Sequence, residues 1–207
     1  MDTYRRRIVD DELDAVFPAL AAISLDGPMG VGKTATGSRR AATVLPVDRA
    51  DVAERLAADA NLLTRAAKPV LLDEWQRVPE TWDLVRRAVD RDRSGGQFLL
   101  AGSAAPVVAP VHSGAGRIVS LRMRPLSIAE RTGDRPPISL SALLTGTGEI
   151  AGETGWQLPD YVREIVASGF PGIRDLPDRA RRLALDGYLA RIVERDMVEQ
   201  GFRVRAP

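Results

Sequence analysis

Residues 27–34 read Gly-Pro-Met-Gly-Val-Gly-Lys-Thr, the phosphate-loop spacing of Gly, four residues, Gly, Lys and Ser or Thr. Glycines in such a loop let backbone N–H groups turn inward around phosphate oxygens. The lysine reaches the β- and γ-phosphates of a nucleotide, and the following hydroxyl is a ligand for Mg²⁺. The pattern predicts a site for ATP and Mg²⁺ built from Gly27, Pro28, Met29, Gly30, Val31, Gly32, Lys33, Thr34 and Ala35.

A pair of acids, Asp73 and Glu74, follows the apolar run Val70-Leu71-Leu72 and lies 40 residues after Lys33. In an open α/β sheet, ligands bind at the carboxyl ends of strands. An aspartate at such an end holds Mg²⁺ directly or through water, and an adjacent glutamate orients and deprotonates an attacking water. We therefore expect Thr34 and Asp73 to be the metal ligands and Glu74 to be the catalytic base.

Ser103 and three arginines are further candidates. Ser103 ends the apolar run 98–102, and we expect it either to lie between the two acids and the γ-phosphate or to be an ordinary turn serine. Arg117, Arg122 and Arg124 surround another apolar run, and arginine stabilises the charge on a transferred phosphoryl group. Arg117 ranks first because it directly follows the Gly/Pro-rich loop 104–116.

Alternating strands and helices must position these residues. Apolar runs predict strands at 21–26, 42–47, 69–73, 97–102 and 117–123, and helices are predicted at 9–20, 34–42, 50–65 and 80–91. This alternation is typical of an α/β fold with a parallel sheet covered on both faces. After residue 125 the sequence predicts short helices and a long one at 178–199, so we divide the chain into a domain at 1–125 and a mostly helical segment at 126–207.

Composition excludes several classes of function. A net charge of +1 over 207 residues provides no general field for attracting nucleic acid or an acidic membrane. The chain has no cysteine and a single histidine, His112, which excludes disulfides, thiol catalysis and a histidine metal cluster. No run reaches the roughly 18 apolar residues of a membrane helix, so we expect no membrane contact and a cytoplasmic location.

Basic residues are almost all arginines. Of 29 basic residues only Lys33 and Lys68 are lysines, and we expect Lys68 to be an ordinary surface residue. The run Arg5-Arg6-Arg7 near the amino terminus is typical of a solvated face, with contact to a phosphate or a partner as the alternative. The scarcity of lysine therefore makes Lys33 notable, because a compact ammonium on a flexible stem suits phosphate binding.

Together these residues resemble the bacterial AAA-type P-loop ATPases, and more narrowly the group that carries a C-terminal domain of unknown function. The resemblance rests on the phosphate loop and on residues 71–76, 100–104 and 116–127, while residues 168–172 and 187–196 are similar to the start of that C-terminal domain. It implies a three-layer P-loop NTPase sandwich whose parallel sheet has the strand order 5-1-4-3-2. Because members of the group continue well past the position of residue 207, we expect this chain to be truncated in its second domain.

The resemblance also implies roles and partners. Asp73 would be the Mg²⁺-associated acid, Glu74 the catalytic glutamate and Ser103 the first sensor, and Arg117 matches an arginine that recurs in the group. The expected function is Mg²⁺-dependent ATP hydrolysis. Two alternatives stay open: a P-loop kinase acting on a small acceptor, and a non-catalytic module that binds nucleotide, DNA or a protein partner. Assembly into a homo-oligomer is open as well.

Overall fold

A five-stranded parallel sheet lies at the centre of the computed structural model, which describes residues 4–59, 61–103, 114–133, 138–199 and 201. The order β2-β3-β4-β1-β5 confirms the predicted one, read from the opposite edge. β1 lies between β4 and β5, so the loop that follows β1 leaves the interior of the sheet. The strands are β1 (Ala22–Asp26), β2 (Thr43–Pro46), β3 (Val70–Asp73), β4 (Phe98–Gly102) and β5 (Ile118–Arg122).

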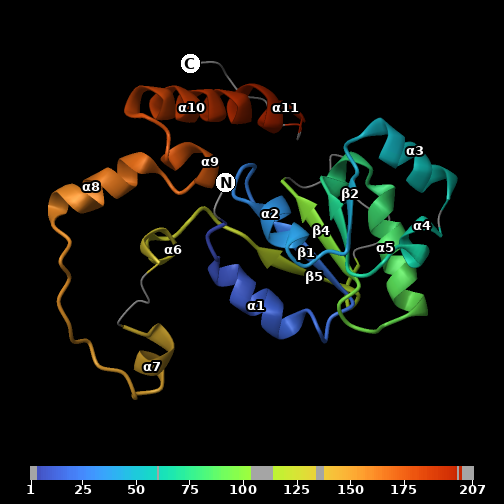
Figure 1. Cartoon of the computed structure of the whole chain (residues 1–207), viewed down its shortest axis with the longest axis horizontal. Coiled ribbons are helices and arrows are strands. Elements are labelled where there is room, and N and C mark those ends of the chain that lie inside the picture. The colour runs from blue at the N-terminus through green and yellow to red at the C-terminus, as the bar shows by residue number, and fades with distance from the viewer. Residues whose placement is uncertain (1–3, 60, 104–113, 134–137, 200, 202–207) are drawn as a thin grey trace.

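Helices cover both faces of the sheet (Figure 1), as predicted for a three-layer sandwich. α1 (Ile8–Val16) and α2 (Lys33–Ser38) lie on one face, and α3 (Ala50–Ala58), α4 (Leu62–Arg65) and α5 (Glu80–Arg91) lie on the other. Side chains alternate between the two faces along each strand. Leu71 accordingly packs with the α1 layer, whereas its neighbours Val70 and Leu72 pack with the layer of α3 to α5.

The structure corrects one predicted helix. The sequence predicts a single helix over 50–65, but α3 ends at Ala58 and a separate helix, α4, begins at Leu62. Asp59 has an extended backbone, with φ −135° and ψ 90°, and its carboxylate accepts a hydrogen bond of 3.0 Å from the N–H of Asn61. Such local bonding by an aspartate competes with helical hydrogen bonds, and here it separates the two helices.

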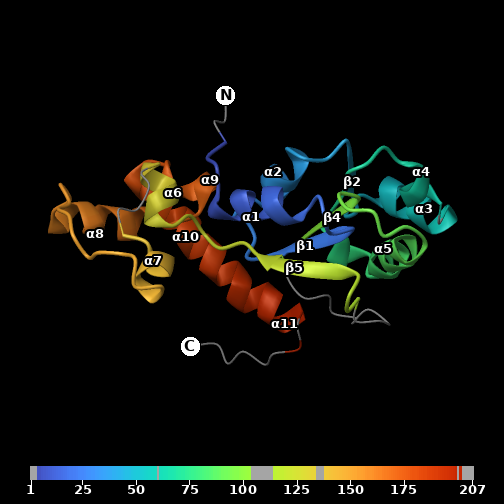
Figure 2. The same ribbon diagram turned by 90° about the horizontal axis from the view of Figure 1, so that it is seen from below.

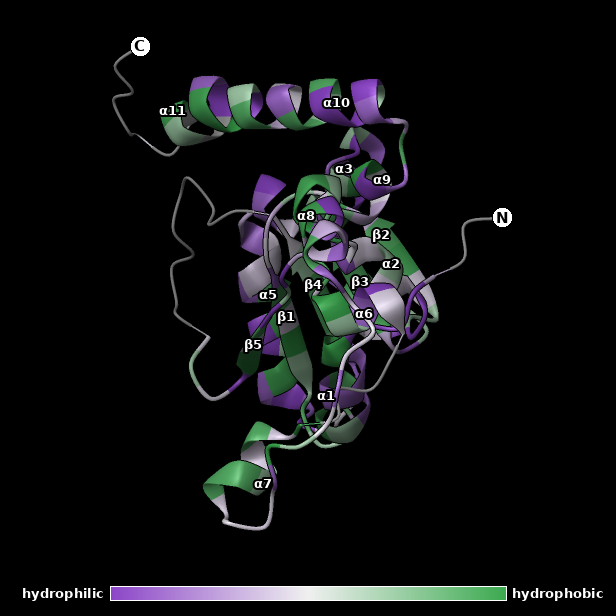
Figure 3. Cartoon of the chain, turned by 90° about the vertical axis from the view of Figure 1, so that its left-hand side faces the viewer, coloured by the Kyte–Doolittle hydropathy of each residue, from purple (hydrophilic) through white to green (hydrophobic). Residues whose placement is uncertain are grey.

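Beyond β5 the regular elements in the described residues are all helices. α10 overlaps the sheet in the view of Figure 2, but Figure 1 shows that it lies apart from the strands, and it carries a mixture of hydrophobic and hydrophilic residues along its length (Figure 3). Leu183 and Leu189 of α10 are both more than half exposed. The helices are α6 (Ile128–Thr132), α7 (Leu140–Leu144), α8 (Leu158–Ala167), α9 (Pro171–Arg174), α10 (Asp178–Arg191), a π-helical turn (Ile192–Asp196) and α11 (Met197–Glu199).

Lys68 differs from the expectation of an ordinary surface residue. Its Nζ donates a hydrogen bond of 2.6 Å to the carbonyl of Leu63 and lies 3.5 Å from the ring centroid of Phe98. Burial lowers the pKa of Lys68 to about 8. Phe98 is the first residue of β4, so this lysine lies at the amino edge of the sheet.

Two further expectations concern His112 and membranes. His112 lies outside the described residues. In the part of the chain that the structure describes, no helix combines the length and the apolar character needed to span a bilayer.

Candidate functional site

The predicted phosphate loop connects β1 to α2, and its glycines serve two different purposes. Gly30 and Gly32 have φ values of 79° and 100°, in the left-handed region that glycine adopts most readily. Gly27 is needed for space, because a Cβ there would lie 2.1 Å from the backbone carbonyl oxygen of Met123. The loop therefore turns at two glycines and passes against the end of β5 at the third.

We expect Gly27→Ala to lower the free energy of unfolding by roughly 2–3 kcal/mol, because the new methyl group would overlap a backbone atom that cannot rotate away. Gly187→Ala is the matched control. Gly187 lies inside α10 with open space around its Cα, so alanine there should stabilise the chain by about 0.5–1 kcal/mol. Urea-induced unfolding of both variants measures the difference, and equal stability of Gly27→Ala and the wild type would contradict the close approach.

Lys33 is buried inside the loop. It is the first residue of α2, its side chain is 5 % exposed, and its Nζ donates hydrogen bonds of 2.9 Å to the carbonyls of both Gly27 and Pro28. Burial lowers the pKa of Lys33, and the carboxylates of Glu74, Asp73 and Asp26 act in the opposite direction. The ammonium group thus lies at the beginning of the loop, beside the cluster of acids.

Thr34 and Asp73, the two predicted metal ligands, are in direct contact. Thr34 Oγ1 donates a hydrogen bond of 2.8 Å to Asp73 Oδ1, which joins the start of α2 to the end of β3. Burial raises the pKa of Asp73, and the neighbouring carboxylates of Glu74 and Asp48 add to this rise. A hydroxyl and a carboxylate surrounded by further acids fit Mg²⁺, a hard cation that takes oxygen ligands and completes its shell with phosphate and water.

Glu74 and Ser103 lie side by side at the carboxyl edge of the sheet. Glu74 has φ 54° and ψ 38°, a left-handed conformation that is costly for a residue other than glycine and that often marks a functional site. Ser103 Oγ donates a hydrogen bond of 3.3 Å to Glu74 Oε2. Gln76, to which the sequence pattern assigns no role, joins them: its Nε2 donates to the same oxygen at 2.6 Å and to Ser103 Oγ at 3.2 Å.

Arg117 does not lie near these residues. It directly precedes β5, at the amino edge of the sheet, and its Nε pairs with Asp90 at 2.7 Å. β5 runs parallel to β1 with Arg122 beside Asp26, so the phosphate loop lies roughly 15 Å further along the strands. Within one chain, Arg117 is therefore not the arginine nearest to the phosphate loop. Arg122 and Arg124, which follow at the carboxyl edge of the sheet, lie closer to it.

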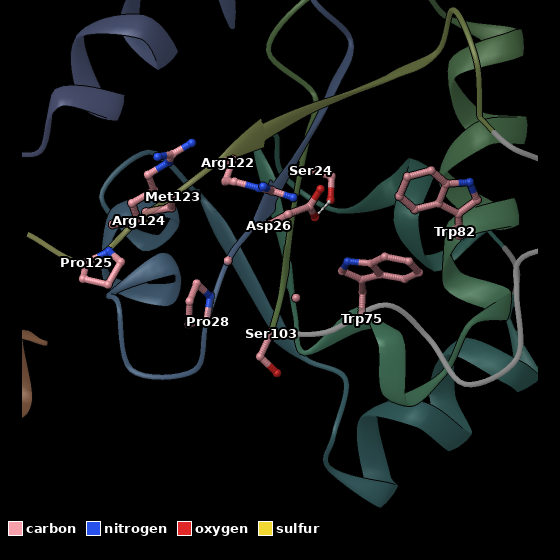
Figure 4. A pocket seen from close by; sticks show the side chains of 12 residues that line it. Ser24, Asp26, Pro28, Trp75, Trp82, Ser103, Arg122, Met123, Arg124 and Pro125 are labelled. Atoms are coloured by element: carbon pink, nitrogen blue, oxygen red, sulfur yellow. Dashed lines mark hydrogen bonds between the residues drawn. The ribbon is translucent and has the colours of Figure 1, made fainter. Parts of the chain in front are cut away.

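A pocket of about 640 Å³ opens beside the phosphate loop (Figure 4). Gly27, Pro28 and Ser103 border it on the side of the loop and the acids. Arg122 points into it from the end of β5, next to the carboxylate of Asp26. Its inner wall contains two indole rings with centroids 4.8 Å apart, those of Trp75 and Trp82.

Arg7 is a further residue at the loop, and its burial contradicts the expectation of a solvated face for the run Arg5-Arg6-Arg7. Arg7 is 4 % exposed, and its guanidinium donates hydrogen bonds of 2.6 Å to the carbonyl of Val31 and 2.7 Å to that of Arg124. Its Nε pairs with Glu130 at 3.1 Å. No feature of the sequence distinguishes this arginine from Arg6, its neighbour, which is exposed. Arg7 joins the amino-terminal segment to the phosphate loop.

We expect Arg7→Met to lower the free energy of unfolding by about 3–5 kcal/mol, because Glu130 would stay buried without its cationic partner and the Val31 carbonyl would lose its donor. The matched control is Arg6→Met. Arg6 is 62 % exposed and pairs with Asp11 and Asp14, so its loss should change stability by less than about 1 kcal/mol. Thermal unfolding compares the two, and equal effects would contradict a buried role for Arg7.

The helical segment reaches the phosphate loop from outside. Tyr188 of α10 donates a hydrogen bond of 3.3 Å from its hydroxyl to the carbonyl of Met29. The ring of Phe170 lies 4.7 Å from that of Tyr188 and approaches Gly30. Two aromatic side chains from the carboxyl-terminal part of the chain therefore lie over the loop.

Comparison with known proteins gives one family and two relatives. The model of a family described as AAA domain matches residues 21–132, which contain the phosphate loop, both acids and Ser103. Two uncharacterized proteins, one from Mycobacterium bovis and one from Mycobacterium tuberculosis, are each 27% identical to this chain over 191 residues. The match covers 89% of this chain but 38% of each relative, so the chain spans well under half the length of these curated relatives.

Proposed function

The chain belongs to the AAA domain family, and from this premise we propose that it binds Mg²⁺ and ATP and hydrolyses the nucleotide. The family is one of nucleotide-binding, ATPase-like domains. The observation that carries the proposal is the 2.8 Å hydrogen bond between Thr34 and Asp73, because it joins the phosphate loop to the acidic pair. The ammonium of Lys33 is buried, and the carboxylates of Glu74 and Asp73 are close enough to raise its pKa against the effect of burial.

Each residue has a distinct part in the proposed reaction. Lys33 would exchange its two carbonyl partners for oxygens of the terminal phosphates, and Glu74 would accept a proton from the attacking water. The water oxygen forms a bond to the γ-phosphorus while the bond from that phosphorus to the bridging oxygen breaks, which leaves ADP and inorganic phosphate. Thr34 and Asp73 would hold Mg²⁺, which neutralises phosphate charge when bound.

A second candidate function is transfer of the γ-phosphate to a small acceptor. The pocket of about 640 Å³ favours it, because this pocket opens at Gly27 and Pro28, the residues whose carbonyls hold the Lys33 ammonium. Asp26, which lines this pocket, would be the base for an acceptor hydroxyl. Phosphate release from ATP when no acceptor is present separates hydrolysis from transfer.

The test is release of inorganic phosphate from ATP by the purified chain, with Mg²⁺ and with a chelator, over a range of protein concentrations. We expect release that depends on Mg²⁺. ATP binding without any turnover would favour the non-catalytic alternative, and absence of ATP binding would overturn the proposal. A rate that rises faster than linearly with protein concentration would indicate a site shared between subunits, where the distant Arg117 is available to a neighbouring chain.

Several finer assignments stay predictions. They are the boundary at residue 125, the C-terminal domain of unknown function, a protein or DNA partner, assembly into a homo-oligomer and a cytoplasmic location. Contacts that cross the boundary, such as the ion pair of Arg7 with Glu130, indicate that the helical segment affects the loop.

A further inference from the structure

Two buried polar atoms next to the site, Nε1 of Trp75 and Oε1 of Gln76, have no hydrogen-bond partner among the residues that the structure describes. Both approach the same point, because a Cβ added to Gly102 would lie 2.7 Å from the Trp75 nitrogen and 2.9 Å from the Gln76 oxygen. One atom is a donor and the other is an acceptor. Buried polar groups are nearly always paired, so two unpaired neighbours of opposite character require an explanation.

The other end of the Gln76 amide explains the arrangement. Its nitrogen donates to the Glu74 carboxylate at 2.6 Å, and because an ionised carboxylate only accepts, the nitrogen must be the end that faces Glu74. The oxygen is thereby left on the side of the Trp75 indole. A displacement of the amide toward the ring would pair this oxygen with the indole N–H, and it would draw the nitrogen away from Glu74.

The side chain of Glu74 needs a hydrogen-bond partner that fixes its direction. Its left-handed backbone lies between β3 and the 3₁₀ turn η1 (Trp75–Arg77), so no regular element fixes the direction of its side chain. The carboxylate is held instead by Gln76 and Ser103, which both donate to Oε2. Because those two side chains also contact each other at 3.2 Å, the three residues form a closed cluster.

We propose that Gln76 is a positioning residue for Glu74. In the arrangement seen here its amide directs the carboxylate toward Ser103. When a bound γ-phosphate and the attacking water draw Glu74 away, the amide oxygen pairs with the N–H of Trp75, which stabilises the released arrangement. The proposal rests on the proposed hydrolysis of ATP, since it assigns a function to Glu74.

Kinetics of two variants test this role. Gln76→Leu keeps the size of the side chain and removes both polar ends, whereas Gln76→Glu keeps an acceptor for Trp75 and removes the donor to Glu74. We expect both to lower kcat by about 10- to 100-fold, because Glu74 loses the donor that directs its carboxylate. KM for ATP should stay within two-fold of the wild type, since the amide of Gln76 donates to Glu74 and Ser103 and not to the phosphate loop.

The matched control is Gln97→Leu. Gln97 is a buried amide at the amino edge of the sheet, bonded to the carbonyls of Asp92 and Ser94. Gln97→Leu should lower the free energy of unfolding and leave kcat unchanged. An unchanged kcat in Gln76→Leu, with the wild type active, would overturn the positioning role alone, whereas a wild type that neither binds nor hydrolyses ATP would overturn the proposed function itself.

Tryptophan fluorescence provides a signature that a merely structural role would not produce. In a Trp82→Phe, Trp156→Phe chain the emission comes from Trp75, and an indole whose N–H gains an acceptor emits at longer wavelength. We expect a red shift when Mg²⁺ and adenylyl imidodiphosphate are added, and no shift when Gln76→Leu is added to this background. Equal shifts in the two chains would contradict the pairing of Gln76 with Trp75.

Discussion

Lys33→Met should lower the rate of ATP hydrolysis by at least about 100-fold, because it removes the one buried ammonium of the described loop and acid cluster while keeping the apolar stem. No cation of the loop would then stabilise the negative charge that develops on the terminal phosphates. Binding of ATP should weaken as well, since the same group contacts the nucleotide before the reaction. The measurement is phosphate release at saturating and at low ATP concentrations.

Lys68→Met is the matched control, because Lys68 is the only other lysine in the chain. It removes the same group at the opposite edge of the sheet, where its Nζ contacts the Leu63 carbonyl and the Phe98 ring. We expect its turnover to equal that of the wild type within two-fold. Equal turnover in Lys33→Met and Lys68→Met would contradict the assignment of residues 27–34 as the site that binds the phosphates of ATP.

Glu74→Gln has the second large expected effect, a fall in kcat of about 10²- to 10⁴-fold with ATP still bound. The amide cannot accept a proton from water at neutral pH, although it keeps the shape of the side chain. Because the phosphate loop and the Thr34–Asp73 contact are untouched, affinity for Mg²⁺ and ATP should change little. Single-turnover phosphate release reports the chemical step, and equilibrium dialysis with ATP reports binding.

The control for this variant is Glu54→Gln. Glu54 is an exposed glutamate in the middle of α3, and it does not directly follow a strand as Glu74 does. Its substitution should alter neither kcat nor ATP binding. If Glu74→Gln released phosphate as fast as Glu54→Gln, another group would have to be the base, and Asp26 in the neighbouring pocket would be the first to examine.

Much of the site could be predicted from the sequence because its parts are local. The spacing of glycines in 27–32 fixes where the backbone turns, and the apolar runs before Gly27 and Asp73 place both at strand ends. In a parallel sheet all strands run in one direction, so residues that follow a strand meet at one edge. The same rule places Arg117 at the opposite edge of the sheet, because this arginine precedes its strand.

Other parts depended on packing that no local pattern reveals. Arg6 and Arg7 look equivalent in the sequence, yet one is exposed and the other lies beneath the loop, because α1 begins where Arg7 faces Val31 and Glu130. The break at Asp59 likewise depends on a side chain that bonds its own turn.

The sequence by itself determined which chemical groups are present: a glycine-rich loop with one lysine, a hydroxyl directly after it and two acids at a strand end. Only the tertiary structure decided which side chains hold those groups in place. Gln76 approaches both Glu74 and Trp75 because the chain turns sharply after β3, and Tyr188 meets Met29 across 159 positions of sequence. Contacts of this kind depend on the relative placement of whole elements, which the burial of the core sets and which the spacing of residues in one segment does not encode.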